Sequence, residues 1–178
     1  MQSSSKNIQD NLYKISSIIH DSENLNIIFE KLSEVIYESI GIKNFYVALL
    51  NRELDLITFP FYTDIKDHAP KQKFSSGRGM TNYAIKKNMK ILINKEEYEQ
   101  LIQNGEVDAI GTAPYYWLGV PLKDFKQTVI GLIAIQTYDK NIKINEDHIQ
   151  LINFISEQLT LAIDRFHHIK ELEHLTYY

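Results

Sequence analysis

The sequence contains no cysteine, and this absence excludes several kinds of chemistry. The chain forms no disulfide bond, offers no thiolate ligand to a metal ion and has no cysteine nucleophile. Disulfides belong mainly to oxidising compartments, so a chain without them fits a reducing one. We therefore expect a cytoplasmic protein that is held together by packing alone.

An excess of positive charge is also missing. Lysine and arginine number 19 against 23 aspartate and glutamate residues, which gives a formal net charge of −4. A nucleic-acid-binding surface needs clustered basic residues to neutralise phosphates, so we expect no nucleic acid partner. No apolar run approaches the roughly 20 residues that span a bilayer, and the polar start Met1–Ser5 is unlike a signal peptide. The sequence therefore predicts a soluble chain without direct membrane contact.

The residues that are present suit one globular domain. The chain has 178 residues, of which 44% are apolar and 24% are charged, close to the average for globular proteins. A chain of this length buries roughly 70% of its unfolded surface when it folds, enough for a core of its own. The length predicts a single domain.

Both ends of the chain carry the spacing of helices that pair with other helices. Apolar residues three and four positions apart form a seam along one side of a helix. The first seam consists of Ile8, Leu12, Ile15 and Ile19. The second seam consists of Ile152, Ile155, Leu159, Ala162, Phe166 and Ile169. The final helix, capped by Asn145, is expected to reach ~30 residues, against about 12 for a typical globular helix. We expect its distal turns to extend beyond the domain.

Between these ends, the pattern alternates between helices and strands. A second helix is predicted over 25–40, with Gly41 at its end. Hairpins are predicted from 45–50 with 54–62 and from 116–122 with 129–138, and a short strand at 91–93. Short helices are predicted from the opening Gly77-Arg78-Gly79 through about Lys87 and over 96–103, and 63–76 is expected to be a polar loop. Pro60 cannot donate a sheet hydrogen bond, so it indicates an edge or a bulge.

This order of elements predicts an α+β fold. Adjacent hairpins favour a central antiparallel sheet of about five or six strands, with helices against its faces and long helices at both ends. A PAS-like sheet is the main alternative. The paired helices before the first strand and the segment Trp117–Pro121 argue against a PAS-like fold.

Five segments, taken in order, resemble the GAF domains of bacterial sensor histidine kinases and cyclic di-GMP signalling proteins. The segments are Phe45–Leu50; Phe59–Tyr62 with Asp64; Gly77–Thr81 with Tyr83; Trp117–Leu122; and Ile130–Gln136 with Tyr138. The resemblance covers about residues 8–170 and implies a GAF-like, PAS-related fold with a sensory role. The final segment Glu171–Tyr178 is similar to the run-in that precedes many GGDEF cyclase domains. The resemblance thus implies an output domain, either a diguanylate cyclase or a histidine kinase.

No segment predicts catalysis, a metal site or a cofactor. The chain has no Gly-x-Ser-x-Gly nucleophile motif. The turn Gly77-Arg78-Gly79 lacks the third glycine of a dinucleotide fingerprint, because Asn82 occupies that position. Asp64, Asp67 and His68 share one loop, which we interpret as solvated rather than metal-binding. Methionine sulfoxide reductases and bilin-binding relatives depend on cysteines that this chain lacks, so we expect a non-enzymatic domain.

An unusual set of aromatic and polar residues predicts a small-molecule site. The GAF resemblance implies a cleft between one sheet face and the short helices and loops. Such sites are mostly apolar with a few placed polar groups. The candidate residues are Phe59, Phe61, Tyr62, Asp64, Thr81, Tyr83, Tyr116, Trp117, Gln136 and Tyr138. The alternative for the same set is an ordinary core with hydrogen-bonded tyrosines.

These observations divide the chain into three segments. Residues 1–20 are predicted to be a dimerisation helix, 21–165 a GAF sensory domain and 166–178 a signalling-helix linker. The two seams predict a homodimer built through the terminal helices. The leading hypothesis is a regulatory domain that binds an unidentified small molecule and passes a change along its last helix. The alternative is a ligand-free dimerisation spacer.

Overall fold

The computed structural model describes residues 2–176, with side chains from residue 7 onwards. Met1, Tyr177 and Tyr178, which the predicted terminal segments include, lie outside the described residues. The elements in chain order are α1 (Gln2–Asp21), α2 (Leu25–Ile40), β1 (Asn44–Asn51), β2 (Leu56–Thr63), β3 (Gln72–Lys73), α3 (Met80–Lys87), β4 (Ile91–Asn94), α4 (Lys95–Gln103), β5 (Tyr116–Lys123), β6 (Val129–Thr137) and α5 (Glu146–Thr176).

The six strands form one antiparallel sheet in the order β3-β2-β1-β6-β5-β4. The two predicted hairpins are β1–β2 and β5–β6, and they join because β1 also pairs with β6. The predicted α+β class with about five or six strands is confirmed. The short strand β3 lies inside the segment that was expected to be loop, because two residues are too few to show a strand pattern.

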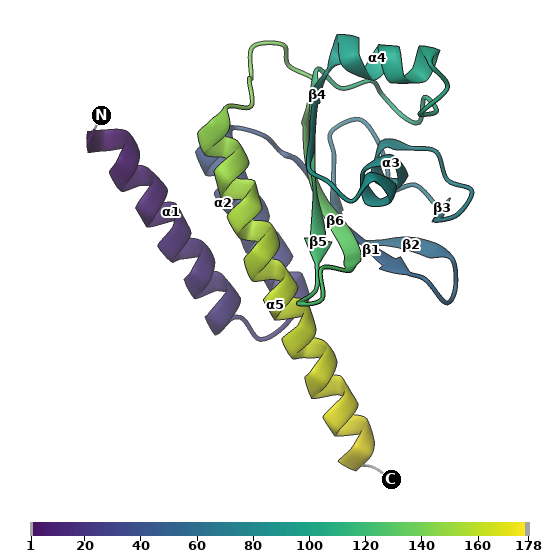
Figure 1. The fold of residues 1–178 in the computed structure, drawn as a ribbon. Helices are drawn as coiled ribbons and strands as arrows, with labels where there is room; N and C mark the ends of the chain where they lie inside the picture. Colours follow the sequence, from purple (N-terminus) through teal and green to yellow (C-terminus); the bar gives the residue numbers. More distant parts are fainter. Residues whose placement is uncertain (1, 177–178) are drawn as a thin grey trace.

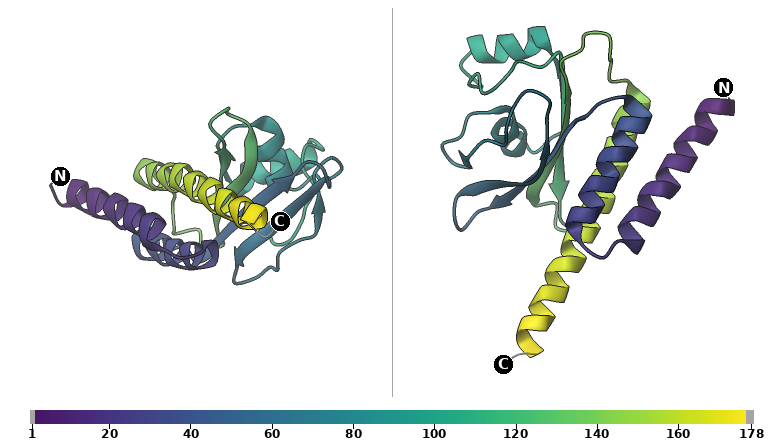
Figure 2. Two further views of the ribbon diagram at one scale, coloured as in Figure 1. Left: turned by 90° about the horizontal axis from the view of Figure 1, so that it is seen from below. Right: turned by 180° about the vertical axis from the view of Figure 1, so that it is seen from behind.

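Helices cover both faces of this sheet (Figure 1). Helices α2 and α5 lie against one face with α1 outside them, and α3 and α4 lie on the other face. The C-terminal half of α5 extends past the sheet, away from the rest of the fold (Figure 2). Two cores therefore exist, one on each face of the sheet.

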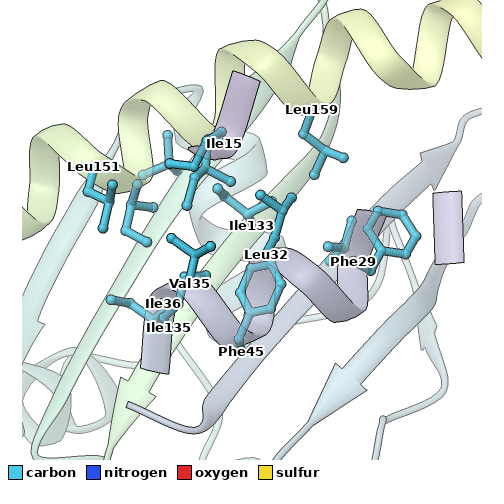
Figure 3. Packing of buried hydrophobic residues seen from close by; sticks show 14 of the residues in the cluster. Ile15, Phe29, Leu32, Val35, Ile36, Phe45, Ile133, Ile135, Leu151 and Leu159 are labelled. Carbon is cyan, nitrogen blue, oxygen red and sulfur yellow. The ribbon is translucent and has the colours of Figure 1, made fainter. Parts of the chain in front are cut away.

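The larger core fills the space between the sheet and the helices α1, α2 and α5 (Figure 3). Ile28, Leu32 and Ile36 of α2 recur every four residues and are fully buried. This regular stripe places one side of the helix on the sheet. The helix begins where the Asn24 side chain accepts a hydrogen bond from the Ile27 amide. It ends at Gly41, whose φ of 80° suits glycine, as the sequence predicted.

A bulge at Pro60 sets which side chains of β2 face each side of the sheet. Val47 pairs with Phe61 and Leu49 pairs with Thr58, so Ala48 alone lies opposite both Phe59 and Pro60. Proline has no backbone N–H to donate, and a bulge accommodates it, as predicted. The extra residue shifts the alternation of faces by one beyond the bulge.

The apolar seams of the two terminal helices pack largely within the chain itself. Ile15, Ile19, Ile155, Leu159 and Ala162 are all buried in the larger core. In this arrangement they face the chain's own helices and sheet, and their part in a dimer interface stays a prediction.

The outer parts of both seams remain accessible. Ile8, Leu12 and Phe166 are half-buried, and Ile169 is 42% exposed. Other exposed apolar residues of the two terminal helices include Tyr13 of α1 and Leu172 of α5. Pairing with a second chain stays a prediction.

Candidate functional site

A cavity of about 80 Å³ lies on the sheet face opposite α2 and α5. The sheet supplies one wall, and α3, α4 and their neighbouring loops supply the others. Figure 1 shows these two short helices standing over that face. The side chains that line the wall from the sheet are those of Tyr46, Phe59, Tyr62, Gln72, Trp117 and Gln136.

The cavity wall is built around a buried chain of hydrogen bonds. Trp117 Nε1 donates to the Tyr46 hydroxyl oxygen over 3.2 Å, and the Tyr46 hydroxyl lies 2.9 Å from Thr81 Oγ1. These residues come from β5, β1 and α3, and each is no more than 5% exposed. The chain of bonds therefore fixes the first turn of α3 against the centre of the sheet.

Strand alternation explains why Trp117 lies here. In β5, Trp117 and Gly119 share a face, whereas Leu118 belongs to the larger core. A Cβ at Gly119 would lie 2.1 Å from the Trp117 ring, so the indole occupies the space above this glycine. Glycine at this position lets the ring lie flat on the sheet.

An aromatic cluster borders the indole. Tyr46 and Tyr62 stack with ring centroids 5.1 Å apart, and Phe59 meets both rings edge-on, at 5.7 Å and 5.8 Å. Such offset and edge-on arrangements are favoured by the ring quadrupoles. Burial raises the pKa of Tyr46 to about 12. At neutral pH this hydroxyl is therefore a proton-bearing donor rather than a base.

A polar network connects the cavity to the loops around it. Gln136 Nε2 donates to Asp64 over 2.6 Å, and the single hydroxyl hydrogen of Tyr138 lies between two acceptors, Asp64 at 2.9 Å and Asp67 at 3.2 Å. Burial, and then the hydrogen bond to Asp64, raises the pKa of Tyr138, so the hydroxyl keeps its proton.

Two further contacts hold the loops together over the site. Asp67 accepts hydrogen bonds from both the backbone N–H and the hydroxyl of Thr112, at 2.8 Å and 3.0 Å. Arg78 pairs with Asp108 at 3.0 Å, which joins the segment before α3 to the segment after α4. The first contact ties the loop after β2 to the loop before β5, so both loops have a defined position beside the cavity.

Half of the predicted binding residues line this cavity. They are Phe59, Tyr62, Thr81, Trp117 and Gln136. Asp64 and Tyr138 do not line the cavity, but both hydrogen-bond to Gln136, which does line it. Seven of the ten predicted residues therefore lie in the cavity wall or bond directly to it, and their role in binding stays a prediction.

Three predicted residues lie elsewhere. Phe61 faces the larger core, packing against Phe29 and Phe45, because the Pro60 bulge turns it to the opposite side from Phe59. Tyr116 also packs against the larger core, because it directly precedes Trp117 and alternates with it. Tyr83 lies in a separate surface groove beside α4, where its hydroxyl donates to Glu106.

Other residues of the wall were not singled out by sequence reasoning. Tyr46, Gln72 and Tyr98 line the cavity from three different elements. Only Tyr46 had a usable signal, because it lies within the quoted segment Phe45–Leu50 and alternates with buried Phe45 and Val47. Gln72 lies in the two-residue strand β3 and Tyr98 in α4, and no local sequence pattern shows that either side chain reaches the cavity.

The loop residues Asp64, Asp67 and His68 do not form an ion site in the described residues. Asp67 and His68 border the cavity, whereas Asp64 faces Gln136 and Tyr138. Within residues 2–176, no group of three or more histidine, aspartate or glutamate side chains is arranged to hold a metal ion. Over the same residues, none of the helices is both long and apolar enough for a membrane span.

We compared the sequence and the structure with known proteins. A family model described as GAF domain matches residues 22–164. No curated protein sequence matches the chain. The structure resembles the GAF domain of a phosphoenolpyruvate-protein phosphotransferase from Coxiella burnetii, with a TM-score of 0.76, 12% identity and coverage of 93% of this chain and 98% of that one.

Two other solved structures show the same arrangement. Free methionine-R-sulfoxide reductase from Neisseria meningitidis, in complex with its substrate, gives a TM-score of 0.70 at 14% identity and covers 88% of both chains. The GAF domain of a two-component sensor histidine kinase from Bacillus halodurans gives 0.62 at 10% identity, covering 84% of this chain and 99% of that one. At these identities, the likenesses show the fold.

Proposed function

The chain belongs to the GAF domain family, and from this premise we propose that it is a non-enzymatic sensory domain that binds a small molecule. The observation that carries the proposal is the cavity of about 80 Å³, with aromatic walls and polar groups from β3, β6 and α3. Ligand sites in proteins combine apolar walls with a few fixed polar groups in this way.

The chemistry of the wall supports binding rather than turnover. The hydroxyls of Tyr46 and Thr81 hydrogen-bond to each other rather than to a base. Activation of a hydroxyl nucleophile requires such a base within hydrogen-bond reach. The chain also lacks cysteine. We therefore assign the site a binding role.

A route from the cavity to α5 runs through the sheet. Trp117 and Gln136 border the cavity, whereas Leu118 and Ile135, their neighbours in the same strands, face the larger core with Leu159 of α5. Suppose that the wall and α5 move together between two arrangements. A ligand with a higher affinity for one arrangement of the wall would then also favour the corresponding position of α5. The distal turns of α5 lead away from the domain (Figure 2).

We further propose that the parent protein has an output domain after α5, a diguanylate cyclase or a histidine kinase. The similarity of the terminal segment to the run-in of GGDEF domains supports the first. The GAF domain of a sensor histidine kinase among the similar structures supports the second. The location that we propose is cytoplasmic.

The sensory role is tested by thermal unfolding of the chain in the presence of nucleotides, organic acids, amino acids, haem and metal ions. A compound present at a hundred times its dissociation constant stabilises the fold by about 2.7 kcal/mol, so we expect a clear rise in melting temperature with at least one class. An unchanged melting temperature with every compound would instead favour the ligand-free spacer. The small volume of the cavity, about 80 Å³, is the observation that favours this second role.

Homodimerisation is proposed through the exposed faces of the terminal helices. Leu161, Leu172 and Leu175 are 61%, 63% and 75% exposed. Separations of eleven and three residues return to nearly the same side of a helix, so the three leucines form one stripe. A second copy of α5 is the partner with the matching stripe.

Replacing Leu172 and Leu175 together by aspartate is expected to weaken the dimer by at least about tenfold, because charges then face each other across the interface. Sedimentation velocity over a concentration series measures the change. The control is Leu54→Asp, which alters an equally exposed leucine in the turn after β1. A wild-type chain that sediments as a monomer at every concentration would rule out the interface.

A further inference from the structure

The cavity is smaller than the pockets in which proteins commonly bind ligands. Its volume is about 80 Å³, whereas ligand pockets commonly measure about 300–1,000 Å³. Even a cavity that binds benzene measures about 150 Å³. A molecule of more than a few atoms can therefore enter only if part of the wall moves.

The wall made by the sheet and α3 is not the part that moves. Trp117, Tyr46 and Thr81 are each no more than 5% exposed, and hydrogen bonds join them into one chain. Moving one of them would leave a buried donor or acceptor without its partner, which is costly. The Trp117 ring also fills the space above Gly119. This side of the cavity is therefore rigid.

The rest of the wall includes two loops with little backbone support. They are residues 64–71, between β2 and β3, and residues 109–114, in the connection from α4 to β5, and together they are the covering loops. Among residues 2–176, no hydrogen bond joins the backbone of either loop to other backbone. Segments with so few backbone bonds open locally at a lower free energy than a sheet does. The residues that they place against the cavity include Asp67, His68, Pro70, Ile110, Thr112 and Pro114.

The ends of both covering loops are fixed. Residues 64–71 begin after β2 and end at β3, which pair with each other. Residues 109–114 lie between two backbone hydrogen bonds, from Asp108 to the Arg78 carbonyl and from Tyr115 to the Thr137 carbonyl, both at 2.8 Å. Each loop can therefore move in its middle while its ends stay in place.

One side chain, that of Asp67, joins the covering loops to each other. It accepts hydrogen bonds from the backbone N–H of Thr112 at 2.8 Å and from the Thr112 hydroxyl at 3.0 Å. In the part of the chain that the structure describes, no other hydrogen bond and no ion pair connects the two loops. Glycine at position 111 permits this approach, because a Cβ there would lie 2.7 Å from Asp67 Oδ2. Asp67 also lies 3.2 Å from the Tyr138 hydroxyl, next to the end of β6.

We propose that the covering loops form a lid over the cavity and that Asp67 is the latch that holds it closed. Breaking the contact between Asp67 and Thr112 separates the two loops and enlarges the cavity from their side. The inference rests on the proposed sensory function, because a lid needs a ligand to admit. It adds the route by which that ligand reaches the site.

Hydrogen exchange of the Trp117 indole N–H in D₂O, followed by NMR, measures the opening without any ligand. Trp117 is the single tryptophan, so its indole gives one signal, and it is buried in the cavity wall. Asp67→Ala removes both hydrogen bonds to Thr112. We therefore expect the indole to exchange at least about tenfold faster, the ratio that one hydrogen bond to a charged group contributes.

Asp124→Ala is the matched control. Asp124 also accepts two hydrogen bonds within a loop, from the amides of Lys126 and Thr128 in the turn between β5 and β6. It is half-buried like Asp67 but does not line the cavity, so we expect the indole to exchange at the wild-type rate. Equal acceleration in both variants would show a general loosening and overturn the lid. A wild-type rate in Asp67→Ala would overturn it as well.

A crosslink distinguishes an opened latch from local damage. The chain has no cysteine, so Asp67→Cys combined with Thr112→Cys places one unique thiol on each covering loop. We expect fast indole exchange before treatment with a short bismaleimide and a return to the wild-type rate or below after it. The melting temperature shows that each variant is folded. Fast exchange that persists after crosslinking would contradict the lid.

The lid and the sensory function fail separately. Fast exchange in Asp67→Ala, together with an unchanged melting temperature of the wild type in every compound, would support the lid and overturn the sensory function. A compound that raises the melting temperature, together with wild-type exchange in Asp67→Ala, would support the sensory function and overturn the lid.

Discussion

Replacing Trp117 by alanine is expected to lower the free energy of unfolding by about 3–5 kcal/mol, the range for removing a large buried aromatic side chain. The indole is 2% exposed, and its N–H is the donor to Tyr46. Its removal leaves an empty space beside the cavity. It also removes the hydrogen bond to Tyr46, whose hydroxyl bonds to Thr81 of α3. We therefore expect this variant to lose ligand binding as well as stability.

Urea unfolding followed by circular dichroism measures this loss. Trp117 is the single tryptophan, so intrinsic tryptophan fluorescence disappears with the substitution and cannot be the signal. Phe125→Ala is the control, because Phe125 is 84% exposed and surface substitutions usually change stability by no more than about 0.5 kcal/mol. A Trp117→Ala variant as stable as Phe125→Ala would show that the indole is not packed as described.

Replacing Gly131 by alanine is expected to cost about 3 kcal/mol or more, at or beyond the upper end for overpacking. A Cβ at this position would lie 2.2 Å from the carbonyl oxygen of Ala48 in the neighbouring strand β1. That atom belongs to the backbone, so no side-chain rotation relieves the clash. The pairing of β6 with β1, which joins the two hairpins, must shift instead.

The matched control is the same substitution at Gly41. No atom lies within 4 Å of a Cβ there, but φ is +80°, so the cost is only the roughly 1–2 kcal/mol of a left-handed residue. Chemical denaturation of the two variants and the wild type compares the effects directly. A Gly131→Ala variant that is at least as stable as Gly41→Ala would contradict the close approach of the two strands.

Local sequence patterns predicted the elements of this fold because their causes are local. The apolar spacing of Ile28, Leu32 and Ile36 identifies one side of a helix whatever lies against it. Pro60 lacks an N–H in any context, so it predicted an edge or a bulge in β2, and the structure has the bulge. Asn145 was recognised as a cap because asparagine can accept from free backbone amides, and in the structure its side chain accepts from the His148 amide. Each of these features needs only a few neighbouring residues.

The sequence predicted only some residues of the candidate site. It found those whose position follows from their own strand and missed those whose position depends on contacts distant in the sequence. Trp117 and Gln136 were found because they are unusual within their own strands. Phe61 was misplaced because the consequence of the bulge, a shift of faces, depends on how β2 pairs with β1. Gln72 was missed because its place in the wall follows from a two-residue strand and from the position of α3.

The sequence by itself determined the class of fold, the two hairpins, the long final helix and the absence of cysteine chemistry. The tertiary structure decided which partner each apolar surface meets. A heptad seam shows that one side of a helix will be buried, but burial is non-directional and does not identify the partner. Here the seam residues Ile15 and Leu159 meet inside one chain. Likewise, only the packing of α3 on the sheet brings Thr81 to Tyr46 and encloses a polar cavity.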